Sequence, residues 1–345
     1  MILKNMGLNI GDYNQMVLNK LGFDINKKIL ITGCAGFIGS NLLEFFLKKG
    51  CDVVGLDNLS TGCLENIELA KEEASEENKN FKFNFIKGDI RDFNCCLNAT
   101  KKINIVFHEA ALGSVQRSFE NPMNSSTNNI ESTLNILKAS LENKVERFIY
   151  ASSSSVYGDT PVLPKTEEMP VNPKSIYAVT KLTSEYYCRL FYSLYGLKTI
   201  SLRYFNVFGK RQNPNSIYSA VIPLFLKNII SNKPPIIFGD GEQSRDFTYI
   251  DNVIYANYLA ATIENNNIFG NFYNVACANK ISLNSIIEFL SDYFKKEIKP
   301  VYKEERIGDV KHSLASLEKV NKDLKYYPII DFFEGLKKLI LKFQF

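Results

Sequence analysis

The sequence is poor in the residues that build metal centres and disulfide frameworks. It has only two histidines, His108 and His312, and its seven cysteines form no C-x-x-C pair. A zinc site of histidine and cysteine is therefore not expected, and neither is any other metal site. An odd cysteine count, with Cys95 beside Cys96, fits reduced thiols better than paired ones, so a cytoplasmic protein is expected. His108 ends a predicted strand, where packing or a hydrogen bond is its expected role.

The sequence also lacks a strong excess of charge and a long apolar segment near its start. The formal net charge is +4, and no basic stripe is interleaved with aromatic residues, so neither nucleic acid nor a membrane is an expected partner. Residues 1–26 contain no continuous apolar core and are interrupted by Asp12, so no signal peptide is expected. We interpret residues 1–27 as an N-terminal extension, helical and packed on the surface.

What the sequence does contain is a strand, a glycine-rich turn and a helix within residues 28–48. Ile29–Thr32 is short, apolar and β-branched, which predicts a buried strand. From Gly36 onwards apolar residues recur at helical spacing. The G-x-x-G-x-x-G pattern of Gly33, Gly36 and Gly39 allows a tight turn and the close approach of a pyrophosphate to the N-terminus of the helix.

An acid follows this unit at the distance that dinucleotide binding requires. Asp57 ends the apolar run 53–56, about twenty residues after Gly36, where an acid suits a ribose 2′-hydroxyl and repels a 2′-phosphate. NAD is therefore the expected cofactor. A membrane helix over residues 29–47 is the alternative, and Asn41, Glu44 and the glycines argue against it.

Strand and helix patterns alternate along the chain up to about residue 205. Further strands are predicted at Asp52–Asp57, 81–87, 104–108, 147–152 and 199–203, with helices at 126–140 and 177–195 and a solvated helix end or loop at 71–80. This alternation predicts an α/β fold, a Rossmann-type doubly wound parallel sheet. After Asn206, prolines and a Gly-Asp-Gly turn break the pattern. We therefore expect an NAD-binding domain at 28–205 and a smaller mixed α/β lobe at 206–345, with some of its segments returning to the first domain.

Tyr177 and Lys181 stand four residues apart, on one face of a predicted helix. A lysine ammonium close to a tyrosine favours the phenolate and lowers its pKa, which would make Tyr177 a usable base. A serine cluster, 152–155, ends the predicted strand before it and could supply a hydroxyl to a reacting oxygen. The alternatives are a surface tyrosine beside a lysine, and serines that satisfy only their own backbone.

Together these motifs resemble the NAD-dependent sugar-nucleotide epimerase/dehydratase family of extended short-chain dehydrogenases/reductases. The resemblance runs from about residue 28 to about residue 324. It is carried by T-G-C-A-G-F-I-G-S-N at 32–41, D-N-L-S-T-G at 57–62, G-D-I at 88–90, H-E-A-A at 108–111, S-S-S-V-Y-G-D at 153–159, Y-A-V-T-K at 177–181, L-R-Y-F-N-V-F-G at 202–209 and R-D-F-T-Y-I at 245–250. A narrower similarity, to UDP-N-acetylglucosamine 4-epimerases, lies in A-A-L-G-S-V-Q-R-S at 110–118 and G-D-V-K-H-S-L-A at 308–315.

The resemblance implies a role for each matching residue. It implies that the catalytic residues are Ser153, Tyr177 and Lys181. It implies that the NAD pyrophosphate is bound by Gly33, Gly36, Phe37, Ile38 and Gly39. It implies that Asp57 and Asn58 contact the adenosine ribose and that Asp89 and Ile90 contact the adenine. The other implied NAD contacts are Ala110, Ala111, Tyr177 and Lys181. It implies that the substrate is contacted by Ser153, Asn206, Arg245, Arg306, Asp309 and Ser313.

The implied activity is the interconversion of UDP-N-acetylglucosamine and UDP-N-acetylgalactosamine through a transient 4-keto sugar. Within the family a small residue at the position of Ser313 resembles enzymes that accept N-acetylated sugars, and a tyrosine there resembles those restricted to UDP-glucose and UDP-galactose. A 4-epimerase of UDP-glucose or of a UDP-hexosaminuronic acid stays an alternative, and Arg117 is a candidate to meet the acid. A dehydratase or decarboxylase is less expected, because Ser154 and Ser155 replace the carboxylates that those enzymes carry. A non-catalytic nucleotide-binding protein would be expected to have lost the tyrosine or the lysine.

The resemblance also implies a homodimer, in which helices 126–140 and 177–195 pack against their copies. Tyr187, Leu190, Phe191 and Leu194 fall at helical spacing and predict an apolar surface on the second helix. The alternative is that this surface faces the sheet.

Overall fold

A computed structural model describes residues 18, 21–213, 220–305 and 311–343 of the chain. Two of the predicted substrate residues, Arg306 and Asp309, lie outside these ranges, as does most of the N-terminal extension.

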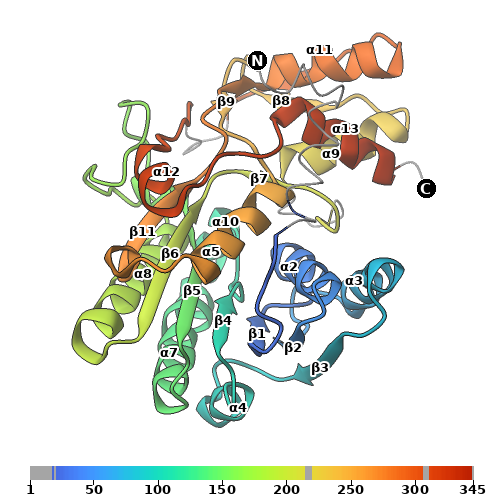
Figure 1. The fold of residues 1–345 in the computed structure, drawn as a ribbon. Coiled ribbons are helices and arrows are strands. Elements are labelled where there is room, and N and C mark those ends of the chain that lie inside the picture. The colour runs from blue at the N-terminus through green and yellow to red at the C-terminus, as the bar shows by residue number, and fades with distance from the viewer. Residues whose placement is uncertain (1–17, 19–20, 214–219, 306–310, 344–345) are drawn as a thin grey trace.

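A seven-stranded parallel sheet forms the centre of the molecule, with strand order β11-β6-β5-β4-β1-β2-β3 (Figure 1). Its strands are β1 (Ile29–Thr32), β2 (Asp52–Asp57), β3 (Lys82–Lys87), β4 (Ile105–His108), β5 (Arg147–Ser153), β6 (Lys198–Tyr204) and β11 (Asn271–Val275). The predicted Rossmann-type sheet is confirmed, and the six predicted strands differ from the observed ones by no more than one residue at either end.

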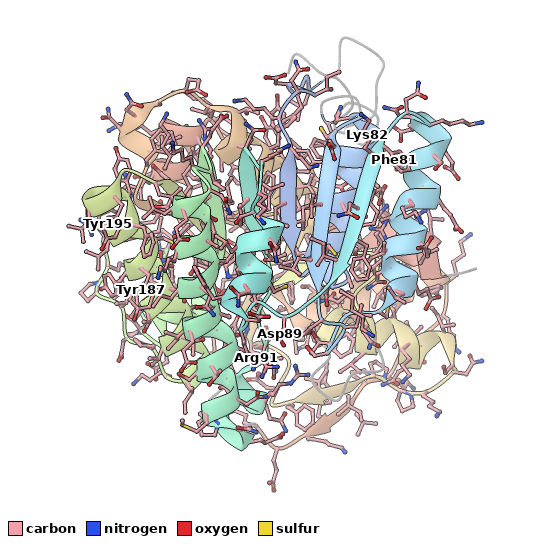
Figure 2. The ribbon with its side chains drawn as sticks, turned by 90° about the horizontal axis from the view of Figure 1, so that it is seen from below. Phe81, Lys82, Asp89, Arg91, Tyr187 and Tyr195 are labelled. Atoms are coloured by element: carbon pink, nitrogen blue, oxygen red, sulfur yellow. The ribbon has the colours of Figure 1, made fainter. Side chains whose placement is uncertain are left out.

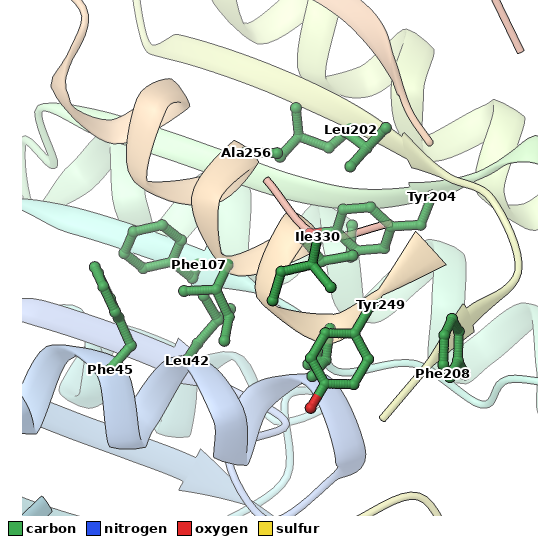
Figure 3. Close-up of a cluster of buried hydrophobic side chains, with 14 of the residues drawn as sticks. Leu42, Phe45, Phe107, Leu202, Tyr204, Phe208, Tyr249, Ala256 and Ile330 are labelled. Atoms are coloured by element: carbon green, nitrogen blue, oxygen red, sulfur yellow. The ribbon is translucent and has the colours of Figure 1, made fainter. Parts of the chain in front are cut away.

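Successive residues of each strand pack on opposite faces of this sheet. In β1, Ile29 and Ile31 belong to one buried cluster and Leu30 to the other. The first face is covered by α2 (Phe37–Lys48), α3 (Leu64–Glu77) and α10 (Ile250–Thr262), and the second by α4 (Phe93–Ala99), α7 (Ser132–Glu142) and α8 (Ile176–Tyr195). Figure 3 shows α2, β4, β6 and α10 contributing side chains to the first cluster. Burial on both faces explains the largely apolar sequences of the central strands β1 and β4, whereas the edge strand β3 is partly exposed and carries two lysines.

The second lobe is assembled from short strand pairs and helices that lie above the sheet in Figure 1. β7 (Val207–Phe208) pairs with β10 (Thr248–Tyr249), β8 (Ile236–Phe238) with β13 (Val301–Lys303), and β9 (Ser244–Arg245) with β12 (Ile281–Ser282). Its helices are α9 (Val221–Ile230), α11 (Leu283–Phe294) and α13 (Phe332–Phe343), and α12 (Glu318–Leu324) contacts β11. Two elements beyond residue 206 associate with the central sheet: β11 pairs with β6, and α10 packs on the sheet.

One helical segment departs from the predicted pattern. The helix predicted at 126–140 is divided into α6 (Pro122–Ser126), a π-helical turn at Thr127–Glu131 and α7, and a short α5 (Val115–Glu120) precedes them. Around the turn, Ser132 and Thr133 donate to backbone carbonyls four residues earlier, a bonding pattern that perturbs a regular helix. For the polar segment 71–80 a helix end or a loop was predicted. Residues 71–77 form the end of α3, whose Ala70 and Ala74 pack on the core, and residues 78–80 lie beyond the helix.

None of the helices in the described ranges combines the length and the apolar character needed to cross a bilayer.

Candidate active site

The glycine-rich turn connects β1 to α2 at the carboxyl end of the sheet. Gly33 has a positive φ of 71°, and a Cβ there would lie 2.7 Å from the Ala110 backbone nitrogen. At Gly39 a Cβ would lie 2.2 Å from the Gly33 carbonyl oxygen. These two glycines are therefore required by the packing of the turn itself.

Gly36 is different, because it faces the cleft. A Cβ at Gly36 would meet only the Gly33 carbonyl oxygen, at 3.2 Å, and the residue lines the pocket at this edge of the sheet. Gly36 is also the N-cap of α2 and offers no side chain to the backbone N–H groups of the first turn. A turn that leaves helix N–H groups unpaired beside a pocket fits the pyrophosphate of a dinucleotide.

Asp57, the last residue of β2, lines the same pocket, and Asp89, which follows β3, is hydrogen-bonded to the pocket residue Asn58. Asp57 accepts hydrogen bonds from the backbone nitrogens of Ala35 at 3.0 Å and Leu59 at 2.7 Å, while burial raises the pKa of its carboxyl. Asn58 Nδ2 donates to Asp89 at 2.9 Å, and Arg91 donates to both oxygens of that carboxylate (Figure 2), so the pKa of Asp89 is lowered to about 2. The pocket is lined by the glycine turn and by the residues at and after the ends of β2, β3 and β4. Its lining includes Gly33, Gly36, Asp57, Asn58, Ile90, Glu109, Ala110 and Ala111. An acid held at the end of β2 and an apolar recess beyond it fit the adenosine of NAD.

Ser153, Tyr177 and Lys181 meet where β5 ends and α8 begins. Ser153 is the last residue of β5, and its Oγ accepts a hydrogen bond from the Ser155 nitrogen at 3.2 Å. Ser175 caps α8 by accepting from the Ala178 nitrogen at 3.1 Å, which fixes the first turn that carries Tyr177. One turn further on, Lys181 lies with its Nζ 5.9 Å from the centre of the Tyr177 ring.

The electrostatics of this pair differ from the prediction. Burial raises the pKa of Tyr177, although a hydrogen bond with the Ser153 side chain acts in the opposite direction. Burial lowers the pKa of Lys181 to about 8. The prediction that Lys181 brings the pKa of Tyr177 below its ordinary value is therefore wrong, because the net change in this pKa is a rise. Lys181 Nζ donates to the Ala151 carbonyl at 2.7 Å. Desolvation of the buried phenolate outweighs the hydrogen bond from Ser153.

The four serines separate into different roles. Ser152 is buried and donates to the Glu185 carboxylate, which forms a buried ion pair with Arg203 at 2.7 Å. Ser152 therefore supports the fold and does not face a reacting group. Ser154 and Ser155 open a 3₁₀ turn at Ser154–Tyr157, and the Ser155 Oγ is buried with no partner among the described residues. Ser153 is the member of the cluster that contacts Tyr177.

The substrate residues predicted from distant motifs come together in the second lobe. Asn206, in a positive-φ conformation just after β6, donates from Nδ2 to Ser313 Oγ at 3.3 Å. The Ser313 nitrogen donates to the Ser244 carbonyl at 3.1 Å, so it lies beside Arg245 on β9. Arg245 Nη1 donates to the Lys311 carbonyl at 3.1 Å. Arg306 and Asp309 lie outside the described residues.

Two acids of this site were not among the predicted residues. Asp246 follows Arg245 and is fully buried, and its carboxylate accepts from the backbone nitrogens of Cys277 at 2.9 Å and Ala315 at 3.0 Å. Burial raises its pKa to about 6. Asp246 thus joins three segments of the lobe around Ser313. The other acid is Glu109, which directly follows β4 in the cofactor pocket. The signals in the sequence are the H-E-A-A motif, where Glu109 follows an apolar strand, and the R-D-F-T-Y-I motif, which contains Asp246.

His108 has the role expected of it. It is buried, and its two ring nitrogens lie 2.7 Å from Thr32 Oγ1 and 2.9 Å from Thr133 Oγ1. Burial lowers the pKa of the imidazole to about 3, so the ring stays neutral and links β1, β4 and α7.

Comparison with known proteins places this arrangement among dinucleotide-dependent enzymes. Residues 29–276 match the model of the NAD dependent epimerase/dehydratase family. A putative UDP-glucose 4-epimerase of Methanocaldococcus jannaschii is 34% identical, over 90% of this chain and 97% of its own length. The structure of a UDP-N-acetylglucosamine 4-epimerase from Methanobrevibacter ruminantium, in complex with UDP-N-acetylmuramic acid, has a TM-score of 0.84 at 37% identity and covers 92% of this chain and 98% of its own.

A third similar protein was solved with the cofactor. The UDP-glucuronic acid 4-epimerase of Bacillus cereus, in complex with UDP-glucuronic acid and NAD, has a TM-score of 0.81 at 32% identity, over 92% of this chain and 100% of its own.

Proposed function

The chain belongs to the NAD-dependent epimerase/dehydratase family and is an NAD-dependent UDP-sugar 4-epimerase, and we propose that UDP-N-acetylglucosamine and UDP-N-acetylgalactosamine are its preferred substrates. The observation that carries the proposal is the small side chain of Ser313 in hydrogen-bond contact with Asn206. The similarity to the UDP-N-acetylglucosamine 4-epimerase of Methanobrevibacter ruminantium supports it.

In this proposal NAD is held by the glycine turn and by the acids at the ends of β2 and β3. The unpaired N–H groups behind Gly36 bind the pyrophosphate, Asp57 and Asn58 bind the adenosine ribose, and Asp89 with Ile90 borders the adenine. When bound, NAD supplies the acceptor and donor of a hydride.

Tyr177 takes the proton of the sugar 4-hydroxyl in this proposal and returns it at the end of the reaction. Ser153 contacts Tyr177 and donates to the same sugar oxygen, which orients it. Lys181 lies against the Tyr177 ring, and its ammonium favours the phenolate. The intervening 4-keto sugar rotates before reduction, so the pocket must hold the sugar in two orientations.

Arg245, Arg306 and Asp309 are proposed to hold the UDP portion. An arginine binds two oxygens of a diphosphate at once. Arg245 stands on β9 next to Ser313, which places a cation beside the proposed sugar pocket.

The volume argument favours N-acetylated sugars. A 2-acetamido group is several heavy atoms larger than a hydroxyl, and a large ring at position 313 would obstruct at least one of the two sugar orientations. Packed sites relieve such overlap poorly. Serine leaves this space open.

A UDP-hexuronic acid is the second candidate, because the Bacillus cereus neighbour binds UDP-glucuronic acid. Arg117 on α5 is the residue of this chain proposed to meet a sugar carboxylate. A dehydratase or decarboxylase is less well supported, because Ser154 and Ser155 stand where those enzymes carry carboxylates.

The deciding experiment is an assay of the purified protein on UDP-glucose, UDP-N-acetylglucosamine and the corresponding uronic acid, side by side. We expect the highest kcat/KM for UDP-N-acetylglucosamine, with product and substrate of equal mass. Loss of water or carbon dioxide by mass spectrometry would replace the proposal with a dehydratase or decarboxylase, and a preference for either other sugar would reject the N-acetyl assignment.

We also propose a cytoplasmic homodimer. All seven cysteines, each within the described ranges, are free thiols, as in a reducing compartment. The dimer is supported by exposed apolar side chains on α8 and on the α5–α6 segment, among them Leu190, Leu194, Phe119 and Met123.

A further inference from the structure

Glu109 is an acid in the cofactor pocket that the proposed proton transfer does not use. It directly follows β4 and lines the pocket with Ala110. Tyr204 Oη donates to Glu109 Oε1 at 2.9 Å, and Asn257 Nδ2 of α10 donates to the same Tyr204 oxygen at 2.8 Å. Tyr204 at the end of strand β6 thus holds this carboxyl at the carboxyl edge of the sheet, and α10 holds Tyr204.

The sheet register brings Glu109 close to Lys181. β4 and β5 pair with His108 opposite Tyr150, so the next residues, Glu109 and Ala151, are neighbours at the carboxyl edge. The Ala151 carbonyl is the acceptor of Lys181 Nζ, at 2.7 Å. Among the charges around Lys181, Glu109 gives the largest stabilisation of its ammonium form.

We infer that Glu109 is a positioning residue of this active site, whose carboxylate keeps Lys181 in its ammonium form and so maintains the positive charge on which Tyr177 depends. The inference rests on the roles proposed for Tyr177 and Lys181 and is independent of which sugar is preferred.

Among the groups around Lys181, Glu109 is the one whose own charge changes near neutral pH and so alters the stability of the Lys181 ammonium. The titratable groups facing Lys181 are His108 and Glu109 at the end of β4, Tyr150 on β5, and Tyr177, Glu185 and Cys188 on α8, and Tyr204 of β6 faces Glu109. Burial keeps His108 neutral and raises the pKa of Tyr150, Cys188 and Tyr204, and Glu185 is paired with Arg203.

The carboxyl of Glu109 has a pKa near neutral pH. Burial raises its pKa to about 7, and the Tyr204 hydrogen bond and Lys181 act against this rise. Its negative charge also raises the pKa of Tyr177. Removing the charge therefore lowers the pKa of both Lys181 and Tyr177, which moves the two limbs of a pH profile in the same direction.

The test compares the NAD-loaded wild type with Glu109→Gln, on the UDP-sugar that the wild type converts fastest. We expect both limbs of the kcat/KM profile to move to lower pH by about one unit. Glu146→Gln is the matched control, because Glu146 pairs with Lys27 and Asn104 at the opposite end of the sheet, and its profile should stay in place. A Glu109→Gln profile that loses height while both limbs stay in place would overturn the inference.

Thermal unfolding supplies a readout that does not need activity. A lysine with a native pKa of about 8, below its ordinary 10.5, makes the fold more stable as the pH rises between these values. In Glu109→Gln this rise should begin about one pH unit lower. An unchanged onset would contradict the inference. If the wild type converts no UDP-sugar, the proposed function fails, while this measurement still decides whether Glu109 supports Lys181.

Discussion

Ser153, Tyr177 and Lys181 are neighbours because a strand end and a capped helix start meet at one edge of the sheet. Ser153 closes β5, and the Ser175 cap starts α8 immediately before Tyr177. The helix then brings Lys181 under the Tyr177 ring one turn later. Small shifts of this helix start would separate the hydroxyls, which is why the cap matters for the chemistry as well as for stability.

Replacing Tyr177 by phenylalanine tests the proposed base. The ring still fills its buried site, but the oxygen that accepts the proton is gone, so we expect turnover to fall by about 10²–10⁴-fold. NAD content and UDP binding, measured by absorbance and calorimetry, should change little. Tyr327→Phe is the control, because Tyr327 is 63% exposed. Turnover near the wild-type level in Tyr177→Phe would remove Tyr177 from the mechanism.

Replacing Ser313 by tyrosine tests the proposed sugar gate. The new ring would fill the space beside Asn206, so we expect turnover of UDP-N-acetylglucosamine to be nearly lost while UDP-glucose is spared or improved. Steady-state kinetics on the two sugars measure the effect, with Ser313→Ala as the volume-neutral control. An equal loss on both sugars would mean that Ser313 is not the gate.

Residue patterns predict chemistry better than they predict electrostatics. The spacing of Gly36, Asp57, Tyr177 and Lys181 could be read from the sequence because each belongs to a local strand–turn–helix pattern. The direction of the Tyr177 pKa could not, because it depends on burial by segments far away in the chain. The role of Glu109 could not be predicted for the same reason, because its partner Tyr204, itself held by Asn257, reaches it only in the folded sheet.

At the scale of elements, α8 has one apolar face that packs on the sheet and one that is exposed. The prediction of one apolar surface is wrong for Phe191, which is 8% exposed and packs with the sheet. Tyr187 also contacts that cluster, whereas Leu190 and Leu194 are 47% and 66% exposed. Figure 2 shows Tyr187 and Tyr195 along this helix at one side of the molecule. Helical spacing alone shows that apolar residues line up, but not which of the two faces meets the core.

The exposed face of α8 is the place to test the dimer. Leu190→Asp puts a charge where the proposed interface buries an apolar side chain, so we expect a dimer to dissociate at micromolar concentration. Sedimentation velocity measures the change, and circular dichroism checks that the fold is intact. Leu341→Asp is the control, since Leu341 is similarly exposed at 53% but lies on α13. A wild type that sediments only as a monomer would refute the dimer.

The central strands β1 and β4 were predictable because strands buried on both faces are rich in apolar residues, and a glycine follows β1. The π-helical turn at Thr127–Glu131 and the strand β11 were not predicted. The π-helical turn depends on side chains that donate to backbone carbonyls. The strand β11 depends on its pairing with β6, which is distant in the sequence and is not indicated by a local pattern.

At the scale of the whole molecule, buried charges connect the first domain to the segment that enters the second lobe. Glu44 of α2 is 6% exposed and forms ion pairs with Arg211 and Lys210, which follow β7. Glu73 of α3 joins the same two cations and also pairs with Lys342 of α13 at 3.2 Å. Helices α2 and α3 are thereby linked through Lys210 and Arg211, and α3 is also linked to α13.

Glu44→Gln should therefore destabilise the whole fold. Removing one partner of a buried ion pair leaves the cations uncompensated, which costs about 3–5 kcal/mol. Burial alone would raise the pKa of Glu44, but Lys210, Arg211 and Lys48 outweigh it and hold the pKa well below its ordinary 4.5. The contribution of this carboxylate to stability is thus fully present above about pH 4.5 and is lost as the pH falls below that value towards the native pKa.

Urea unfolding of wild type and Glu44→Gln at a series of pH values measures this contribution. The difference in unfolding free energy should be largest at pH 7 and should narrow below pH 4.5, because the wild-type carboxylate then becomes protonated as well. Glu72→Gln, an exposed acid on α3, should track the wild type throughout. A difference that stays constant down to the lowest pH at which the wild type folds would assign the loss to packing, because only a charged Glu44 can make the penalty depend on pH.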